Sequence, residues 1–303
     1  MLNGYLQIIL TAIGFAALPV ITKLGYNLGL TEGIMLLLRF LIASVTLVFL
    51  LLMSKSNRFY TYKSYLPQLV VHGLVFFGSA YCYTLSIKYM SATITNILLY
   101  TYPLMVVLMS TFIFKEKITL IKGVTLLTTF FGCLLVIDVI SMSTQQMSRL
   151  GVLYGIGSAV FYAIYNINGQ YLAKKKLQPL TITTYTSIVC LLATVIVFPP
   201  VNAFVGHSYS AMCLVGLGTA LLCTVMPLFC YAKGIAVLGA SRASILSNIE
   251  PVFAIVLAGL LLGDRLTIIQ LTGALLIIFG AMLLKLDEVK HPNTLNHSVT
   301  RQV

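Results

Sequence analysis

Long apolar runs dominate this chain and restrict the folds that it can adopt. One of them, "LLLRFLIASVTLVFLLLM" at residues 36–53, contains a single charged side chain. A helix of about 20 apolar residues crosses the hydrocarbon layer of a bilayer, whereas a membrane-spanning β-strand alternates apolar and polar residues. Because the runs are continuous and only 9% of the residues are charged, the sequence predicts an all-α membrane protein.

Ten such runs are predicted transmembrane helices. The predicted spans are 5–24, 33–53, 66–88, 92–114, 120–139, 150–173, 180–199, 209–231, 240–262 and 267–285. The segment before the first span has no basic residue, unlike a secretory signal peptide, so we expect this span to remain in the protein.

The basic residues indicate the orientation of the predicted helices. Of the 19 Lys and Arg residues, fourteen follow even-numbered spans, four follow odd-numbered spans and Arg39 lies within the second span. Segments rich in Lys and Arg remain in the cytoplasm. We therefore expect a multi-pass protein of the inner (cytoplasmic) membrane with both termini in the cytoplasm. The basic residues that give the net charge of +12 are then expected to interact with anionic lipid, and no nucleic acid is expected as a partner.

The chain contains two copies of one five-helix unit. "YTLSIKYMSATITNILLYTYP" (83–103) aligns with "YAKGIAVLGASRASILSNIEP" (231–251) at an offset of 148 residues, and "KEKIT" (115–119) aligns with "GDRLT" (263–267). An odd number of spans in each copy places the second copy upside down in the membrane. Such an inverted repeat is typical of secondary transporters that work by alternating access.

We expect the first repeat at residues 1–139 and the second, inverted repeat at residues 140–286. The polar residues 287–303 are expected to form a disordered cytoplasmic tail.

The sequence resembles the EamA group of the drug/metabolite transporter superfamily over about residues 4–285. The resemblance depends on Lys23, on Arg39-Phe40 and on the proline of the fourth span followed by "FKEKIT". It depends further on "YAIYNINGQYLAK" (162–174) and above all on "NIEPVFAIVLAGLLLGDRLTIIQLTGALLIIFG" (248–280). The resemblance implies a ten-helix transporter for a small metabolite, with a cavity among helices 1–4 and 6–9 and with helices 5 and 10 as peripheral supports.

The chain departs from this family at three positions. Members often carry a tryptophan early in helices 1 and 6, where this chain has Phe15 and Tyr162. The first repeat has Thr125 at the position that corresponds to Gly273.

Two charged residues lie deep in the predicted membrane region. Glu250 is about 13 Å into the ninth span at about 1.5 Å per residue, and a charge at that depth rarely faces lipid. It is predicted to contact substrate or a proton; the alternative is a structural glutamate bound by a basic residue or a backbone donor. Arg39 is predicted to hold an anionic substrate group or to pair with Glu250, and the alternative is an anchor for packing at the interface.

The repeat places a polar stripe on each half. Thr93, Asn96, Tyr100 and Pro103 share one helical face, and their repeat-mates are Ser241, Ser244, Asn248 and Pro251. We expect the two stripes to line a cavity near the midplane; helix packing by small polar residues is the alternative. The candidate residues for substrate binding or coupling are Glu250, Arg39, Asn248, Ser247, Ser244, Tyr100, Asn96, Tyr165, Asn166 and Lys23.

The predicted function is secondary active transport of a small organic metabolite, an amino acid or a similar solute, with export as the favoured direction. Protons are the candidate coupling ion. The alternatives are uptake or exchange of a nucleotide-like metabolite, and a channel or lipid scramblase without coupling.

Other classes are disfavoured. An enzyme needs clustered acid, base or metal-binding residues, and only Glu250 and Arg39 lie deep. There is no GxxxxGK[ST] loop for ATP, no CxxC among six cysteines and no HxxxH or HExxH among four histidines. We expect no metal and no cofactor. The expected partners are the small-molecule substrate and membrane lipid, and the expected assembly is a monomer or a homodimer.

Overall fold

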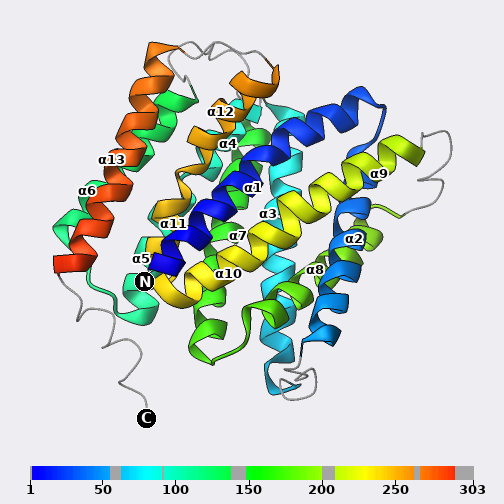
Figure 1. Cartoon of the computed structure of the whole chain (residues 1–303), viewed down its shortest axis with the longest axis horizontal. Coiled ribbons are helices and arrows are strands. Elements are labelled where there is room, and N and C mark those ends of the chain that lie inside the picture. Colours follow the sequence, from blue (N-terminus) through cyan, green and yellow to red (C-terminus); the bar gives the residue numbers. More distant parts are fainter. Residues whose placement is uncertain are drawn as a thin grey trace.

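The computed structural model describes residues 2–54, 63–90, 92–137, 148–199, 209–262 and 267–290, which form a helical assembly without a β-strand (Figure 1). The helices are α1 (Leu2–Asn27), α2 (Glu32–Met53), η1 (Lys63–Tyr65), α3 (Leu66–Tyr89), α4 (Ala92–Leu99), α5 (Tyr102–Phe114), α6 (Leu120–Val136), α7 (Arg149–Lys174), α8 (Pro179–Val197), α9 (Tyr209–Leu217), η4 (Gly218–Val225), α10 (Met226–Leu238), α11 (Ala240–Ser247), α12 (Glu250–Leu262) and α13 (Ile268–Lys290).

Eight segments of the described chain are long and apolar enough to cross a membrane. They are Asn3–Asn27, Glu32–Met53, Leu66–Tyr89, Ile94–Phe114, Arg149–Lys174, Pro179–Val197, Met212–Leu238 and Ala240–Leu257. The predicted fifth and tenth spans form the shorter apolar helices Leu120–Val136 and Ile268–Leu284. The all-α membrane fold is confirmed, whereas the predicted number of ten spans is not.

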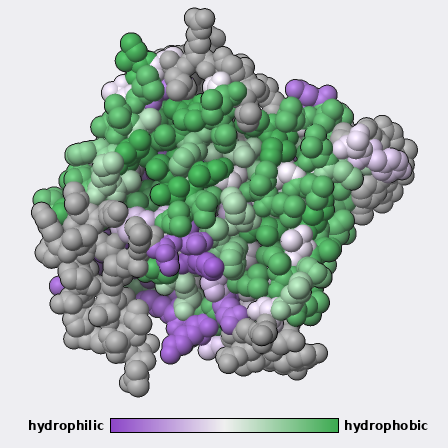
Figure 2. Space-filling view, viewed as in Figure 1, coloured by the Kyte–Doolittle hydropathy of each residue, from purple (hydrophilic) through white to green (hydrophobic). Residues whose placement is uncertain are grey.

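The surface of the assembly is suited to lipid. Figure 2 shows hydrophobic residues over most of one face, with hydrophilic residues gathered mainly towards its lower part. Leu120, Ile268 and Phe112 are each at least 80% exposed. A water-soluble monomer rarely exposes a contiguous apolar surface of this kind. The helices that carry these residues, α5, α6 and α13, therefore face hydrocarbon.

The main helix contacts join the two halves of the chain. α3 packs against α7, and the equivalent helices α10 and α1 pack against each other. α2 packs against α8, and α6 packs against α13. Each pair combines one helix from either repeat, as an inverted repeat requires.

The pair α6 and α13 lies at one side of the molecule (Figure 1), as the resemblance implies. Their backbones touch: a Cβ added at Gly273 would meet the Gly132 carbonyl oxygen at 2.6 Å. This contact explains why Gly273 is a glycine. Thr125 of α6 is the repeat-mate of Gly273, and its carbonyl oxygen lies 3.5 Å from a Cβ added at Gly280 of α13.

The predicted fourth and ninth spans are not continuous helices. α4 ends at Leu99 and α5 begins at Tyr102, while α11 ends at Ser247 and α12 begins at Glu250. These bounds coincide under the offset of 148 that aligns the repeats. Pro103 and Pro251 each occupy the second position of the new helix, where a missing N–H breaks no helical hydrogen bond. Each proline therefore follows a two-residue turn that interrupts the α-helix, while Thr101 and Asn248 keep right-handed helical backbone angles.

Two predicted boundaries fall outside or beside the described residues. The boundary between the repeats, at 139/140, lies within the undescribed residues 138–147. α13 continues to Lys290, past the predicted start of the tail at 287. The rest of the predicted tail, 291–303, lies outside the described residues.

Candidate functional site

The two helix breaks meet inside the protein. The Tyr100 hydroxyl, at the first break, donates to Glu250 Oε1 at 3.4 Å. The Tyr102 hydroxyl, two residues on, donates to the carbonyl oxygen of Ser244 in α11, also at 3.4 Å. Tyr100 and Tyr102 are buried, and they join the broken helix of one repeat directly to that of the other.

Glu250 is the first residue of α12 rather than a residue within a long helix. The free N–H groups and the dipole at a helix start favour a negative charge there. The side chain is half-buried, and Tyr100 is its side-chain hydrogen-bond partner. Among the described residues, the one ion pair joins Glu116 and Lys122. Among the side chains that the structure describes, which do not include that of Lys23, no basic residue pairs with the Glu250 carboxylate.

Four tyrosine rings pack together beside the breaks; we call Tyr102, Tyr162, Tyr165 and Tyr231 the tyrosine cluster. The ring centroid of Tyr162 lies 4.6 Å from that of Tyr102, 5.6 Å from that of Tyr165 and 6.3 Å from that of Tyr231. Tyr162 is partly exposed and the other three rings are buried. The cluster combines an apolar wall with phenol hydroxyls, which suits an amphiphilic solute.

Asn166 holds this cluster in place. Its side-chain oxygen accepts a short hydrogen bond from the Tyr231 hydroxyl, and its amide donates to the Tyr162 carbonyl at 2.7 Å. The structure thus brings the predicted residues Tyr165 and Asn166 together. Tyr102 and Tyr231 were not among the predicted site residues, although the repeat pairs Tyr231 with Tyr83.

Arg39 contacts a different element. Its Nε donates to Thr224 Oγ1 at 2.6 Å, and its Nη2 donates to the Cys223 carbonyl at 3.3 Å. Both acceptors belong to η4, a π-helical segment within the predicted eighth span. A π-helix leaves carbonyl groups without their usual α-helical partners, so a buried guanidinium can bind there. No hydrogen bond or ion pair joins Arg39 to Glu250 in the described part of the chain.

The remaining predicted residues are placed as follows. Asn248 donates to Thr129 Oγ1 of α6 at 3.3 Å, so it faces a peripheral helix. The hydroxyls of Ser244 and Ser247 donate to carbonyls of their own helix, Ser241 and Ala243. Asn96 accepts from the Tyr83 hydroxyl at 2.7 Å. The side chains of Lys23 and Thr93 lie outside the described part of the structure.

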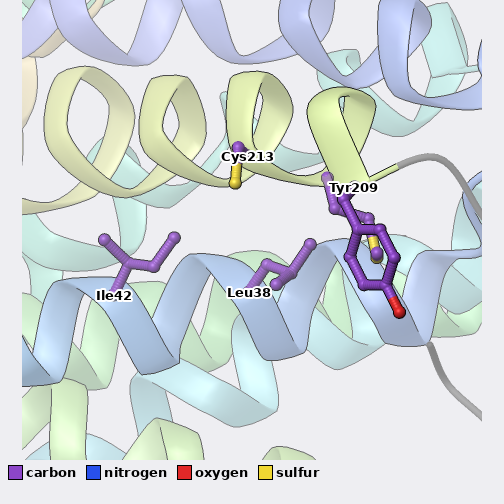
Figure 3. Close-up of a pocket in the computed structure, with 5 residues that line it drawn as sticks. Leu38, Ile42, Tyr209 and Cys213 are labelled. Carbon is purple, nitrogen blue, oxygen red and sulfur yellow. The ribbon is translucent and has the colours of Figure 1, made fainter.

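A separate groove of about 290 Å³ lies between α2 and α9. It is lined by Leu38, Ile42, Tyr209, Met212 and Cys213. Figure 3 shows Leu38 and Ile42 of α2 facing Cys213 of α9. None of these residues belongs to the helix breaks or the tyrosine cluster, and the apolar lining fits a lipid chain better than a polar solute. Among the described residues, no group of three His, Cys, Asp or Glu side chains is placed to hold a metal ion.

Comparison with known proteins places these features in a family. The profile of the EamA-like transporter family matches residues 2–138 and 149–286. The "Uncharacterized inner membrane transporter YhbE" of Escherichia coli (strain K12) is 25% identical over 296 residues, which cover 92% of this chain and 90% of the relative. The "Uncharacterized transporter sll1319" of Synechocystis sp. is 28% identical over 215 residues, covering 71% of this chain and 65% of that relative.

One crystal structure is similar over almost the whole chain. It superposes with a TM-score of 0.76 at 17% identity and covers 95% of this chain and 98% of the other. At this level of identity the similarity shows the fold alone.

Proposed function

Because this chain belongs to the EamA-like transporter family, we propose that it moves a small organic metabolite across the cytoplasmic membrane by alternating access. The protein is a membrane transporter; the substrate, the direction and the coupling are our proposals. We propose secondary active transport, with both termini in the cytoplasm, as the distribution of Lys and Arg favours.

The meeting of the two helix breaks carries this proposal. Broken helices at the interface of inverted repeats supply half-helix ends and backbone groups at mid-membrane depth, where secondary transporters bind their solutes. Here Tyr100 of the first break contacts Glu250 of the second. A solute at this place touches both halves, so a movement of one half against the other changes the side from which it is reached.

The chemistry around the breaks supports a solute with an ammonium group and an apolar body. Glu250 offers a carboxylate without a basic partner among the described residues. The tyrosine cluster offers aromatic faces that attract a cation and pack against apolar groups. An amino acid or a similar amine has both properties. Export is the direction that we propose, and protons that bind Glu250 are the proposed coupling ion.

A nucleotide-like metabolite is the weaker candidate. Its phosphate groups need cationic partners at the site, and Glu250 repels them. Arg39 is the deep cation, but its guanidinium is bound to Thr224 and Cys223 of η4. A channel or scramblase remains as the alternative mechanism. The transport assay described next distinguishes it from a transporter.

The test is transport by the purified protein in proteoliposomes. A panel of amino acids, amines and nucleotides is measured in both directions, with and without a pH gradient. We expect saturable flux and counterflow of an amino acid or amine, accelerated by the gradient. Flux of nucleotides alone would contradict the proposed substrate class. Flux without saturation or counterflow would contradict alternating access.

A further inference from the structure

A single glutamine ties the loop between α5 and α6 to the second half of the chain. Gln170, near the end of α7, donates from Nε2 to Glu116 Oε1 at 3.0 Å. Its Oε1 accepts from the backbone N–H of Ala240 at 2.6 Å. The side chain is buried. We call these contacts among Glu116, Gln170 and Ala240 the Gln170 bridge.

Two lysines support the bridge. Lys122 Nζ lies 3.0 Å from Glu116 Oε2, so the carboxylate uses both oxygens in charge-assisted or polar contacts. Lys174, one turn after Gln170 on the same face of α7, places its Nζ 4.1 Å from the ring centroid of Phe114. The end of α7 therefore contacts both the last residue of α5 and the loop that follows it.

The contact with Ala240 meets a need of α11. Ala240 is the first residue of this helix, and its N–H has no partner within the helix. Gly239 precedes it with φ +80° and has no side chain that can cap the helix. Gln170 supplies the missing acceptor from another helix, so the position of α11 depends on this side chain.

The bridge joins the two half-helices that run from the breaks to the same end of the molecule. α5 leaves the first break and ends at Phe114, and α11 begins at Ala240 and leads to the second break. α11 contacts α5, and both contact α7. The other half-helices, α4 and α12, run from the breaks towards the opposite end (Figure 1).

The repeat changes two of these residues at the opposite end. The helix caps are conserved between the two copies: Lys122 N donates to Thr119 Oγ1, and Gln270 N donates to Thr267 Oγ1, each at 3.2 Å. The bridging residues are conserved only in part. Gln270 replaces Lys122 under the offset of 148, and Glu116 corresponds to Asp264, which lies outside the described residues. α1 and α7 end in equivalent turns at Gly29 and Lys176, an offset of 147 that places Lys23 at the position of Gln170. Gln270 instead accepts from the N–H of Thr267 at 3.0 Å, within its own helical turn.

We infer that the Gln170 bridge is a latch, which keeps the end of the molecule where α11 begins closed. This inference rests on the alternating access of the proposed function. In the proposed orientation the latched end is cytoplasmic. The latch opens when α5 and α11 separate, which requires Gln170 to release Glu116 or Ala240.

A reporter cysteine tests the latch without any substrate. In a variant whose six native cysteines are replaced, Ser247→Cys at the end of α11 is labelled with a membrane-impermeant maleimide in inside-out vesicles, which expose the latched end. We expect Gln170→Ala to raise the labelling rate about tenfold, since it removes two hydrogen bonds, one of them charge-assisted. Glu116→Gln keeps an acceptor but loses the ion pair, and we expect a smaller increase.

The matched control is Gln270→Ala, which removes a glutamine that bonds only its own helical turn; its labelling rate should equal that of the parent. Thermal unfolding shows which variants are folded, and Glu116→Gln carries the test if Gln170→Ala does not fold. If every folded bridge variant is labelled at the same rate as the parent, the latch is overturned. Because labelling needs no substrate, a latch without measurable transport would count against the proposed function alone.

Discussion

Tyr102 and Glu250 occupy equivalent positions: each is the first residue of the half-helix that follows a break, and each is followed by proline. The breaks contact each other through Tyr100 and Glu250. The two copies therefore share an architecture but differ in charge, since one presents a phenol and the other a carboxylate. This difference makes the central site asymmetric.

The breaks themselves should be needed for transport. Pro251→Ala restores an N–H that can bond to a carbonyl one turn earlier, and it removes a penalty of about 3 kcal/mol against a continuous helix. We expect a folded protein with strongly reduced transport, because a straight helix moves Glu250 away from Tyr100. The control is Pro67→Ala at the start of α3, where no break follows, and it should transport normally. Equal rates for the two variants would show that the break is dispensable.

How far the sequence predicts this fold can be seen at these positions. The apolar runs and the offset of the repeats were sufficient to predict the helices and the equivalence of segments 83–103 and 231–251. The breaks were not predicted, because apolar composition is the same on both sides of a break and proline is compatible with a kink or a helix start. The short apolar stretches of α6 and α13 likewise leave the number of spans open.

The candidate site was predicted only in part. Glu250 and Tyr100 lie at the breaks, Tyr165 belongs to the tyrosine cluster and Asn166 is bonded to it, but Asn248 faces α6. Asn248 follows the last residue of α11, and helical spacing alone does not predict which neighbouring helix its side chain meets. The partner of Arg39 could not be predicted, because a π-helix such as η4 has no sequence signature.

Arg39 is expected to stabilise the fold through η4. Thr224→Val leaves the buried Arg39 Nε without its acceptor, at a cost of about 1–3 kcal/mol. Arg39→Lys replaces the forked guanidinium, which reaches the two acceptors from two different nitrogens, with one ammonium nitrogen. We expect both variants to lower the melting temperature in detergent. Unchanged melting temperatures, together with a raised KM for substrate in Arg39→Lys, would instead assign the guanidinium to the solute.

The α6–α13 pair offers a test of the packing with a matched control. A Cβ at Gly273 would meet the backbone oxygen of Gly132 at 2.6 Å, whereas nothing lies within 4 Å of a Cβ at Gly123. Gly273→Ala must push the two helices apart and should destabilise the protein by about 1–3 kcal/mol. Gly123→Ala should be neutral or stabilising by up to about 1 kcal/mol, because alanine favours the helix. Thermal unfolding measures both; an equal effect of the two changes would contradict the close contact.

The latch should withstand mild acid. Burial raises the pKa of the Glu116 carboxyl, but Lys122, Gln170 and Lys174 outweigh this effect and hold the pKa below its ordinary value. A carboxyl with a lowered pKa contributes stability above its unfolded-state pKa of about 4.3, and the contribution is lost as the pH falls through the folded-state value. Labelling of Ser247→Cys from the latched side should therefore be the same at about pH 7.5 and pH 6 and rise only below about pH 4.

Each labelling rate in that experiment is divided by the rate of the unfolded protein at the same pH, which removes the pH dependence of the thiol itself. Glu116→Gln is the control, and it should show no rise below about pH 4. A rise between about pH 7.5 and pH 6 that Glu116→Gln abolishes would mean that this carboxyl is not held in its charged form.

In the proposed mechanism Glu250, where the two helix breaks meet, binds the solute or the coupling proton. The most direct measurement compares Glu250→Gln with Glu32→Gln, a change of the glutamate that begins α2 at an exposed position. Both are assayed in proteoliposomes with the best substrate of the panel under a pH gradient. We predict that Glu250→Gln is folded but transports no faster than empty liposomes, while Glu32→Gln transports normally. Normal, gradient-driven transport by folded Glu250→Gln would contradict this role of Glu250.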